Sequence, residues 1–503
     1  RSMHDLSKDE QRQHSGLCAT AMLEELNNFV KLGCVQRKPR REANNIVDGK
    51  WVMKWKMIND VKAVKARLTA RGFKDKQQEL DTYSATCTRF GARAVNSFAA
   101  QKKYRLWSLD VSAAFLKGLT FEEIQSLPSG QMRSVQLEID ASTAAVLRNI
   151  PGYEDFNPQL EVLELLKPLW GLKDAPRLFS LRLERVLIET GHHPTKADSK
   201  TYVKHDVHGC CISVVSTHVD DLKGASDDAV REQLCHAIEK VFGKCTFKID
   251  TFTHLGIEHS QDPSSFTVHT HQRAYIAELK PIPLTTAQRH NQEDPCDPAT
   301  ALLYPSLLGG VAWTTQTRPD ILVFVGFLQR NNKAPHNKHV IILNRVLAWL
   351  KSHHSGYTFY GIQLPTCLAV ISDSAFKAQD PDCLSIRGSF VCLCEDRPDR
   401  LGGKIQPWQV SSTKQPRVTR SSFGSELGAA IDAVSTGILI MGFLEEIMLG
   451  PQSADALMNK VEHGGFRIPL ILVIDAKSVY DAITATDVKA VSYTHLTLPT
   501  NRC

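Results

Sequence analysis

The sequence predicts an α+β protein built from two units that meet near residue 355. Three observations support this expectation. In residues 50–58 and 64–70, apolar and basic side chains alternate as in strands with one buried face. Residues 304–352 carry a mostly helical pattern, and after them the chain changes to short β-rich runs. A length of 503 residues also leaves room for more than one domain.

The remaining elements follow from local patterns. A helix is expected around Ala19–Leu32, where Leu23, Leu26 and Val30 recur near helical spacing, and the polar residues 1–20 are expected to be disordered. In the second unit we expect three strands, a helix and a fourth strand, at Cys367–Ser372, Arg387–Cys394, Lys404–Val410, Ser422–Val434 and Ile468–Ile474.

Composition narrows the class of protein. With 42% hydrophobic and 23% charged residues, the chain is expected to be globular rather than disordered. No apolar run reaches the roughly 18 residues that span a bilayer, so no membrane is expected. The 13 cysteines are scattered without zinc-finger spacing, and no secretory signal is evident. We therefore expect an intracellular protein with reduced thiols.

Basic residues are concentrated in one segment, although the net charge of the chain is only +6. Between Gln36 and Lys76 there are 13 Lys and Arg against 4 Asp and Glu, an excess of 13 − 4 = 9. Such a segment is either a solvated surface or a surface that faces the phosphates of a nucleic acid.

Acidic residues stand at the ends of two apolar segments. Asp110 ends the first segment, and Asp220 and Asp221 follow the second. An adjacent Asp pair also suits a tight turn, which needs no catalytic role. If three carboxylates from two strands meet at one point, their repulsion favours divalent cations, as in phosphoryl-transfer sites with two Mg²⁺ ions.

The residues around these acids resemble the motifs of copia-type reverse transcriptases. The motifs occur in the family's order over about residues 23–352, at Lys65–Lys74, Leu109–Gly118, Leu169–Arg177, His218–Asp221, Leu255–Glu258, Tyr304–Gly309 and Thr317–Ile321. This resemblance implies a right-hand polymerase fold with fingers, palm and thumb.

The resemblance also implies roles for individual residues. Asp110 and Asp220 would hold Mg²⁺ or Mn²⁺, with Asp221 as an acidic neighbour. The positions expected beside the incoming nucleotide are Lys65, Arg67, Arg71, Phe115 and Asp174. Lys65, Arg67 and Arg71 either hold triphosphate oxygens or line the template. Phe115 falls where the family excludes a ribose 2′-hydroxyl, and it also suits core packing.

Three positions depart from the family pattern. His218 stands where the catalytic turn usually begins with Tyr, and Phe179 stands where Trp is usual. Asp174 replaces the more frequent Gln, and its charge would repel a phosphate. None of these changes removes an expected metal ligand.

The second unit resembles the RNase H-like domain of the same elements. Asp373 ends a strand, Glu426 lies in a helix and Asp475 ends another strand, which is the family's order of acidic catalytic and metal-binding residues. Ala375 replaces a frequent second Asp, and no fourth acidic ligand follows. The final residues, 491–503, resemble translated sequencing adapter and are expected not to belong to the domain.

The implied organisation is a disordered end at 1–20, fingers and palm at 21–260, thumb and connection at 261–355, and an incomplete, truncated RNase H-like domain at 356–490. The implied function is that of an RNA-directed DNA polymerase of a copia-type LTR retrotransposon, with doubtful ribonuclease H activity. Its partners would be an RNA template, a DNA primer, an RNA–DNA hybrid, dNTPs and other Pol and Gag products of the element. It would act in cytoplasmic virus-like particles, with access to the nucleus. The alternative is a decayed element that folds and binds nucleic acid without catalysis.

Overall fold

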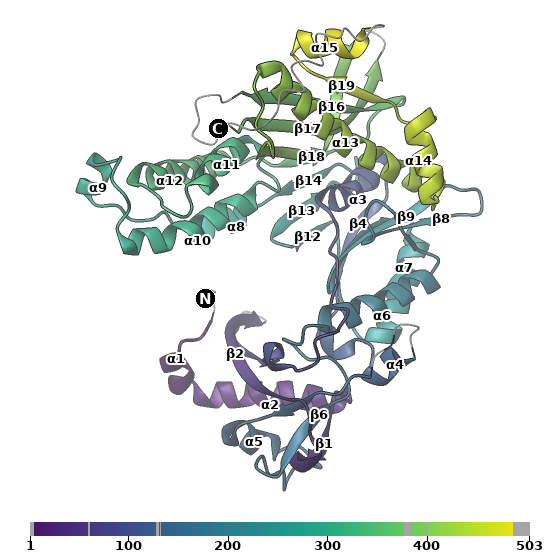
Figure 1. The fold of residues 1–503 in the computed structure, drawn as a ribbon. Helices are drawn as coiled ribbons and strands as arrows, with labels where there is room; N and C mark the ends of the chain where they lie inside the picture. Colours follow the sequence, from purple (N-terminus) through teal and green to yellow (C-terminus); the bar gives the residue numbers. More distant parts are fainter. Residues whose placement is uncertain are drawn as a thin grey trace.

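The computed structural model describes residues 5–58, 61–126, 130, 132–376, 384–397 and 400–485. Figure 1 shows the chain as an open arch, with the N-terminal sheet at the bottom, a second sheet on the right, a group of helices projecting to the left and the C-terminal sheet at the top. The expected α+β class is confirmed, and the arrangement agrees with fingers, palm and thumb followed by a further α/β unit. The adapter-like residues 491–503 lie outside the described residues.

The N-terminal part, the fingers, is a five-stranded sheet in the order β1-β6-β5-β2-β3. Its elements are α1 (Lys8–Gln13), α2 (Ser15–Lys31), β1 (Val35–Pro39), η1 (Arg40–Glu42), β2 (Ile46–Ile58), β3 (Val61–Ala70), β5 (Gln136–Glu138), α5 (Ala141–Leu147) and β6 (Glu161–Leu165). The expected helix and both expected strands are confirmed, and the strands are longer than their alternation suggested. Leu26 and Phe29 of α2 are fully buried in one cluster with Val47 and Leu68, which holds the helix on the sheet.

The expectation of a disordered end at residues 1–20 is wrong from Asp5 onward. Ser7 and Glu10 form a reciprocal capping box at the start of α1, so local hydrogen bonds satisfy the first backbone N–H groups. Leu6 is buried, and its N–H donates to the carbonyl of Met53 on β2. The polar composition of this segment did not reveal its contacts with β2, because their partners lie some 45 residues away in the chain, as in the hydrogen bond from Trp55 to Glu10.

The palm is a six-stranded sheet in the order β11-β4-β10-β9-β8-β7. Its elements are η2 (Gly72–Lys74), α3 (Arg89–Lys102), β4 (Arg105–Asp110), η3 (Ala114–Lys117), α4 (Phe121–Gln125), α6 (Ala175–Glu189), β7 (His193–Pro194), β8 (Thr201–His205), β9 (Cys211–His218), β10 (Asp221–Ser226), α7 (Asp228–Phe242) and β11 (Thr246–Ile249). Gly224 of β10 faces the Trp107 ring of β4 so closely that a Cβ atom would lie 2.2 Å from it. Glycine at this position therefore allows the buried indole to pack between the two strands that carry the acidic residues.

A third sheet, in the order β12-β13-β14-β15, connects the palm to the projecting helices. The elements of this region are β12 (Thr251–His254), β13 (Ile257–Gln261), β14 (Val268–His271), α8 (Arg273–Glu278), α9 (Thr286–His290), α10 (Pro298–Thr314), η4 (Pro319–Ile321), α11 (Leu322–Arg330), α12 (Asn337–Ser352) and β15 (Tyr357–Phe359). The helical character of residues 304–352 is confirmed. The boundary near 355 is wrong by several residues, because β15 pairs with β14 and completes the sheet of the first unit.

The C-terminal unit is a four-stranded sheet in the order β18-β17-β16-β19. Its elements are β16 (Thr366–Ala375), β17 (Ile386–Arg397), β18 (Arg400–Lys414), α13 (Ser422–Leu449), α14 (Ala454–His463), β19 (Leu470–Val473) and α15 (Lys477–Thr484). β19 pairs in parallel with β16, so the acidic ends of these two strands lie at the same edge of the sheet. All the expected strands and the helix are confirmed, but the helix extends 15 residues beyond the expected end at Val434.

By length and composition alone, α13 could cross a membrane, and half of its most apolar window is buried inside the protein. A core helix passes the same test. Ile440 and Phe443 of this helix are fully buried in the cluster that also contains strand residues of β16 and β17. We therefore interpret α13 as a core helix.

One hydrophobic core joins the first unit to the second. It includes Phe90 of α3, Phe359 of β15 and Phe443 of α13, and the rings of Phe90 and Phe443 lie 5.2 Å apart. The buried Arg93 of α3 donates to the backbone carbonyl of Trp408 on β18 at 3.0 Å. The two units predicted from the sequence therefore pack against each other through a shared hydrophobic core.

Candidate metal-binding sites

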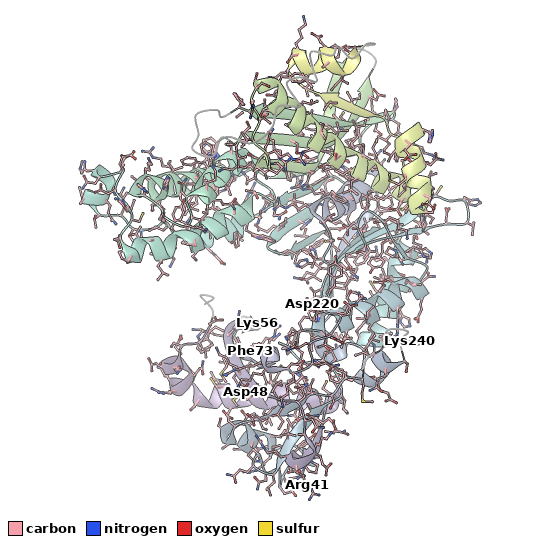
Figure 2. All side chains as sticks on the ribbon, in the orientation of Figure 1. Arg41, Asp48, Lys56, Phe73, Asp220 and Lys240 are labelled. Atoms are coloured by element: carbon pink, nitrogen blue, oxygen red, sulfur yellow. The ribbon has the colours of Figure 1, made fainter. Side chains whose placement is uncertain are left out.

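The central strands of the palm bring the first three acidic residues together. Asp110 is the last residue of β4, and in the antiparallel ladder it lies directly opposite Asp221, the first residue of β10. The N–H of Val111 donates to the carbonyl of Asp220 at 3.1 Å. In Figure 2 Asp220 lies on the inner side of the arch, facing the space that Lys56 and Phe73 border from the fingers.

The turn that presents Asp220 is strained. β9 and β10 are joined by the two residues Val219 and Asp220, and Val219 adopts a φ of 57°. The first position of such a loop favours glycine, and a β-branched residue there costs of order 1–3 kcal/mol. A sequence selected only for a tight turn would not place Val at this position. The functional interpretation of the Asp pair therefore explains the strained Val219, whereas the turn interpretation does not.

Burial and mutual repulsion hinder ionisation of these carboxyl groups. The pKa of Asp221 is raised to about 6 by burial, by the charges of Asp220 and Asp110 and by a hydrogen bond with Asp110. The pKa of Asp220 is also raised, mainly by burial and by the charge of Asp110. Hard oxygen ligands that repel one another at a half-buried point fit a divalent cation such as Mg²⁺.

Two cations of the fingers face these acids. Lys65 and Arg67 project from the exposed face of β3 two residues apart. The pKa of Lys65 is lowered by burial and by Arg67 and Lys56, and the charge of Asp110 partly opposes that change. The positive charge of Arg67 likewise reaches the palm, where it lowers the pKa of Asp220 and so partly opposes the effect of burial. Lys65 and Arg67 therefore lie within electrostatic range of the palm carboxylates.

Arg71 differs from these two cations. Its guanidinium pairs with Asp48 at 3.1 Å, and Lys74 pairs with the same carboxylate at 3.0 Å. The structure thus places Arg71 at the base of the β2–β3 hairpin, where it is already engaged.

Phe115 belongs to a group of three side chains in contact, together with Trp170 and Arg67. Its ring lies 4.6 Å from that of Trp170, and the Arg67 guanidinium lies 4.1 Å from the same indole. Phe115 is half-buried and contacts the cores of both fingers and palm, so the structure agrees with the packing role.

Asp174 does not project into the site as a free carboxylate. It is 3% exposed and binds the buried Arg133, with its Oδ2 atom 2.8 Å from Nε. The structure contradicts the expectation of a free charge at Asp174, because this carboxylate is buried and paired with Arg133.

The basic segment Gln36–Lys76 is not one continuous surface. Arg37, Lys38 and Arg40 pair with acidic residues of β5, β6 and the loop before β6. Figure 2 places Arg41 at the far end of the fingers, away from Asp220. Among the described residues of the segment, Lys65 and Arg67 on β3 lie within electrostatic range of the palm acids.

The second acidic cluster lies in the C-terminal unit. Ligand atoms of Asp373 on β16, Glu426 on α13 and Asp475 after β19 all lie within 4.8 Å of one another. The pKa of Glu426 is raised by burial and by the charges of Asp373 and Asp475, and its buried Oε2 atom has no hydrogen-bond partner. Among the described residues, this is the one group of three His, Cys, Asp or Glu side chains whose ligand atoms meet so closely, and the three palm acids do not.

Sequence reasoning missed two groups near the palm site. Arg133 binds residues 41 and 58 positions away in the chain, so no local motif could reveal it. Glu25 of α2 is buried, and burial raises its pKa to about 7 despite the nearby Arg67 and Lys65. In the sequence, the position of Glu25 on the apolar face of the expected helix, next to Leu26, indicates that its side chain is buried.

Comparisons with known proteins agree with this geometry. Residues 131–291 match the family model described as reverse transcriptase (RNA-dependent DNA polymerase). The chain is 27% identical over 427 residues to the retrovirus-related Pol polyprotein from transposon RE2 of Arabidopsis thaliana, which covers 80% of this chain and 26% of the relative. It is 24% identical over 457 residues to the Pol polyprotein from transposon TNT 1-94 of Nicotiana tabacum, covering 85% of this chain and 32% of that protein.

A solved structure of the foamy viral protease–reverse transcriptase in complex with double-stranded DNA is 12% identical, with a TM-score of 0.48, and covers 90% of this chain and 69% of that one. The predicted resemblance to copia-type Pol polyproteins is confirmed by the family and sequence matches. The chain spans about a quarter of the length of the Arabidopsis relative.

Proposed function

We propose that this chain is an RNA-directed DNA polymerase of a copia-type LTR retrotransposon. It resembles the Pol polyprotein of a plant transposon over four-fifths of its length. The observation that carries the proposal is the alignment of Asp110 with Asp221 beside the strained turn that presents Asp220. Strain of this kind persists where surrounding structure enforces it, and it is concentrated at functional sites.

The residues of the palm fit a pair of divalent cations. Asp110 and Asp220 would hold Mg²⁺ or Mn²⁺, with Asp221 adding negative charge beside them. When bound, such ions activate the primer 3′-hydroxyl and neutralise charge on the leaving pyrophosphate.

The protein's own residues would bind and orient the nucleotide. Lys65 and Arg67 face the acids from β3 and would hold triphosphate oxygens. Phe115 would lie under the sugar, where its ring, fixed by Trp170, leaves little room for a ribose 2′-hydroxyl. We infer that Arg71 holds the fingers hairpin through Asp48 and contributes to nucleotide binding only indirectly.

We propose that the C-terminal unit is an RNase H-like domain whose cluster of Asp373, Glu426 and Asp475 would bind the same kind of cation. Its substrate would be the RNA–DNA hybrid that the polymerase makes. The other partners proposed are an RNA template, a DNA primer, dNTPs and further Pol and Gag products, inside cells and within virus-like particles.

The competing proposal is a decayed element that binds nucleic acid without catalysis. His218 and Ala375 motivate it, whereas the Asp174 carboxylate is buried and paired with Arg133, so it offers no free charge against a phosphate. The retained group of Asp110, Asp220 and Asp221 favours the active enzyme.

Primer extension separates these two proposals. We expect the purified chain to extend a DNA primer on an RNA template with Mg²⁺ and dNTPs, and Asp220→Asn to abolish extension, because an amide cannot replace a carboxylate ligand. A chain that binds the primed template tightly but extends it no better than Asp220→Asn would support the decayed element.

A further inference from the structure

A buried ion triplet joins the fingers to the palm. The Arg133 side chain is 1% exposed, and those of Asp75 and Asp174 are 0% and 4% exposed. The Nη2 atom of Arg133 donates to Asp75 at 2.7 Å, and its Nε and Nη2 atoms donate to the two oxygens of Asp174 at 2.8 and 3.1 Å. Asp75 follows η2 at the end of the fingers hairpin, whereas Asp174 immediately precedes helix α6 of the palm.

The triplet also fixes the backbone around Asp75. Asn45 and the N–H of Gln77 both donate to Asp75 Oδ1, at 2.8 and 3.1 Å. The N–H of Lys76 donates to the side chain of Asn45 at 3.0 Å. Burial opposes the ionisation of Asp75, but the hydrogen bonds from Arg133 and Asn45 outweigh it and lower its pKa. Both sides of the loop at residues 71–77 are therefore held by the same small network.

The backbone of the fingers touches the palm directly beside this network. The N–H of Ala70, at the end of β3, donates to the carbonyl of Trp170 at 2.7 Å. Gly171 has a φ of 89°, and a Cβ atom there would lie 2.1 Å from the carbonyl oxygen of Ala70. The end of β3 and the turn before α6 therefore approach as closely as a backbone without side chains allows.

A buried ion triplet adds little net stability compared with apolar groups of the same size, because the cost of desolvating charges offsets their attraction. The triplet does, however, fix the relative orientation of the groups that it joins. An arginine that donates side-on to a carboxylate fixes both position and angle. This makes the triplet suited to setting the orientation of the fingers hairpin against α6.

We propose that Arg133, together with Asp75 and Asp174, is a positioning residue that sets where the nucleotide-binding face of β3 lies relative to the palm carboxylates. The consequence for the site runs through Trp170. The Arg67 guanidinium lies over its indole, and the Phe115 ring contacts the same indole. A shift of the turn before α6 against β3 would therefore change the place of Arg67 over the nucleotide, while Asp110 and Asp220 stay fixed in their own sheet.

The test uses two conservative variants and a matched control, and its kinetic arm rests on the proposed polymerase function. Asp174→Asn leaves Arg133 paired with Asp75 but weakens the side-on contact. Arg133→Lys keeps the charge and loses the planar fork. The control is Arg37→Lys, because Arg37 also bridges two carboxylates, Asp155 and Glu161, but stands on β1 at the opposite edge of the sheet from β3.

We expect both triplet variants to raise KM for dNTP about tenfold or more, with kcat and the affinity for primed template within about threefold of the parent. Hydrogen exchange should also become faster at the amides of Lys76 and Gln77 in these variants, and Arg37→Lys should change neither quantity. An unchanged KM for dNTP together with faster exchange would overturn the positioning role and leave only a structural one. Unchanged exchange in Asp174→Asn would overturn the network itself.

The two proposals fail in different ways. If the parent chain does not extend primers, the proposed function fails, whereas the exchange measurement still shows whether the triplet holds residues 71–77. If Arg133→Lys does not fold, Asp174→Asn decides the outcome, because it leaves one balanced pair in the interior.

Discussion

Asp110 and Asp221 lie directly opposite each other in the ladder between β4 and β10, and the charge of Asp110 helps to raise the pKa of Asp221. Two acids in this relationship cannot both be ionised without repulsion. Binding of a proton or of a cation would relieve this repulsion, and the proposed polymerase requires the cation. Asp220, at the tip of the strained turn, completes the group.

This relationship predicts different losses for the two neighbouring acids. Asp221→Asn should lower primer extension roughly tenfold, equivalent to about 1.4 kcal/mol, because the amide can still accept from or donate to Asp110. Asp220→Asn should abolish extension. Steady-state extension rates with Mg²⁺ measure both effects, and Glu426→Gln in the other cluster should leave extension unchanged. Equal inactivation by Asp221→Asn and Asp220→Asn would contradict the assigned roles.

The second cluster predicts weak ribonuclease activity. Asp373, Glu426 and Asp475 meet closely, but they supply three ligands, two of which are exposed. Two-metal catalysis requires both ions in fixed geometry, so we expect extension without appreciable cleavage of an RNA–DNA hybrid. Gel analysis of a labelled hybrid checks this. Efficient cleavage without extension would show that the intact half of the chain has been assigned wrongly.

The division of the basic segment predicts which cations bind nucleic acid. Affinity for a primed template should fall steeply with added salt. Lys56→Gln and Lys62→Gln, which change exposed cations of the β2–β3 hairpin, should each reduce the slope of log affinity against log salt by about 1. Arg37→Gln should leave the slope unchanged, because Arg37 is already paired with Glu161 and Asp155. An equal change of the slope in all three variants would mean that the whole basic segment attracts nucleic acid through its summed charge, without specific phosphate contacts.

Glu25 predicts a pH dependence of stability. Burial raises its folded-state pKa from 4.5 to about 7, so between these values the folded chain keeps a proton that the unfolded chain has lost. Stability therefore falls as pH rises through this window. Glu25→Gln should be more stable than the parent at pH 8, by about 2–3 kcal/mol, and similar to it near pH 4.

Urea unfolding at the two pH values measures this difference. The matched control is Glu24→Gln, since Glu24 is the exposed neighbour on the same helix. A stability gain for Glu25→Gln that is the same at both pH values would show that ionisation of Glu25 does not cause it.

The sequence predicted the elements that depend on local pattern. Alternation in residues 50–58 and 64–70 predicts two strands, which form the fingers hairpin, and the motifs around Asp110 and Asp220 predict that these acids end or follow strands. Apolar runs ending in Asp373 and Asp475 predict two further strands, and only the structure shows that these strands are parallel neighbours.

What the sequence did not predict depends on distant partners. Asp174 was read as a charge that repels phosphate, because its neutralising Arg133 lies 41 residues away. β15 was assigned to the second unit, because its pairing with β14 crosses the whole set of projecting helices. The length of α13 was underestimated because its second half is apolar on several faces, which only burial against both units explains.

The shared core has a consequence for the order of synthesis. Arg93 and its acceptor on Trp408 are 315 residues apart in the chain. At about 5–20 residues per second, a ribosome needs roughly 15–60 s to make the intervening residues. During that interval the apolar face of α3, with Phe90, has no partner from α13 or β18. The nascent chain therefore exposes an aggregation-prone apolar surface during this interval. The yield of folded protein in cells should depend on chaperones that cover α3 until the last sheet emerges.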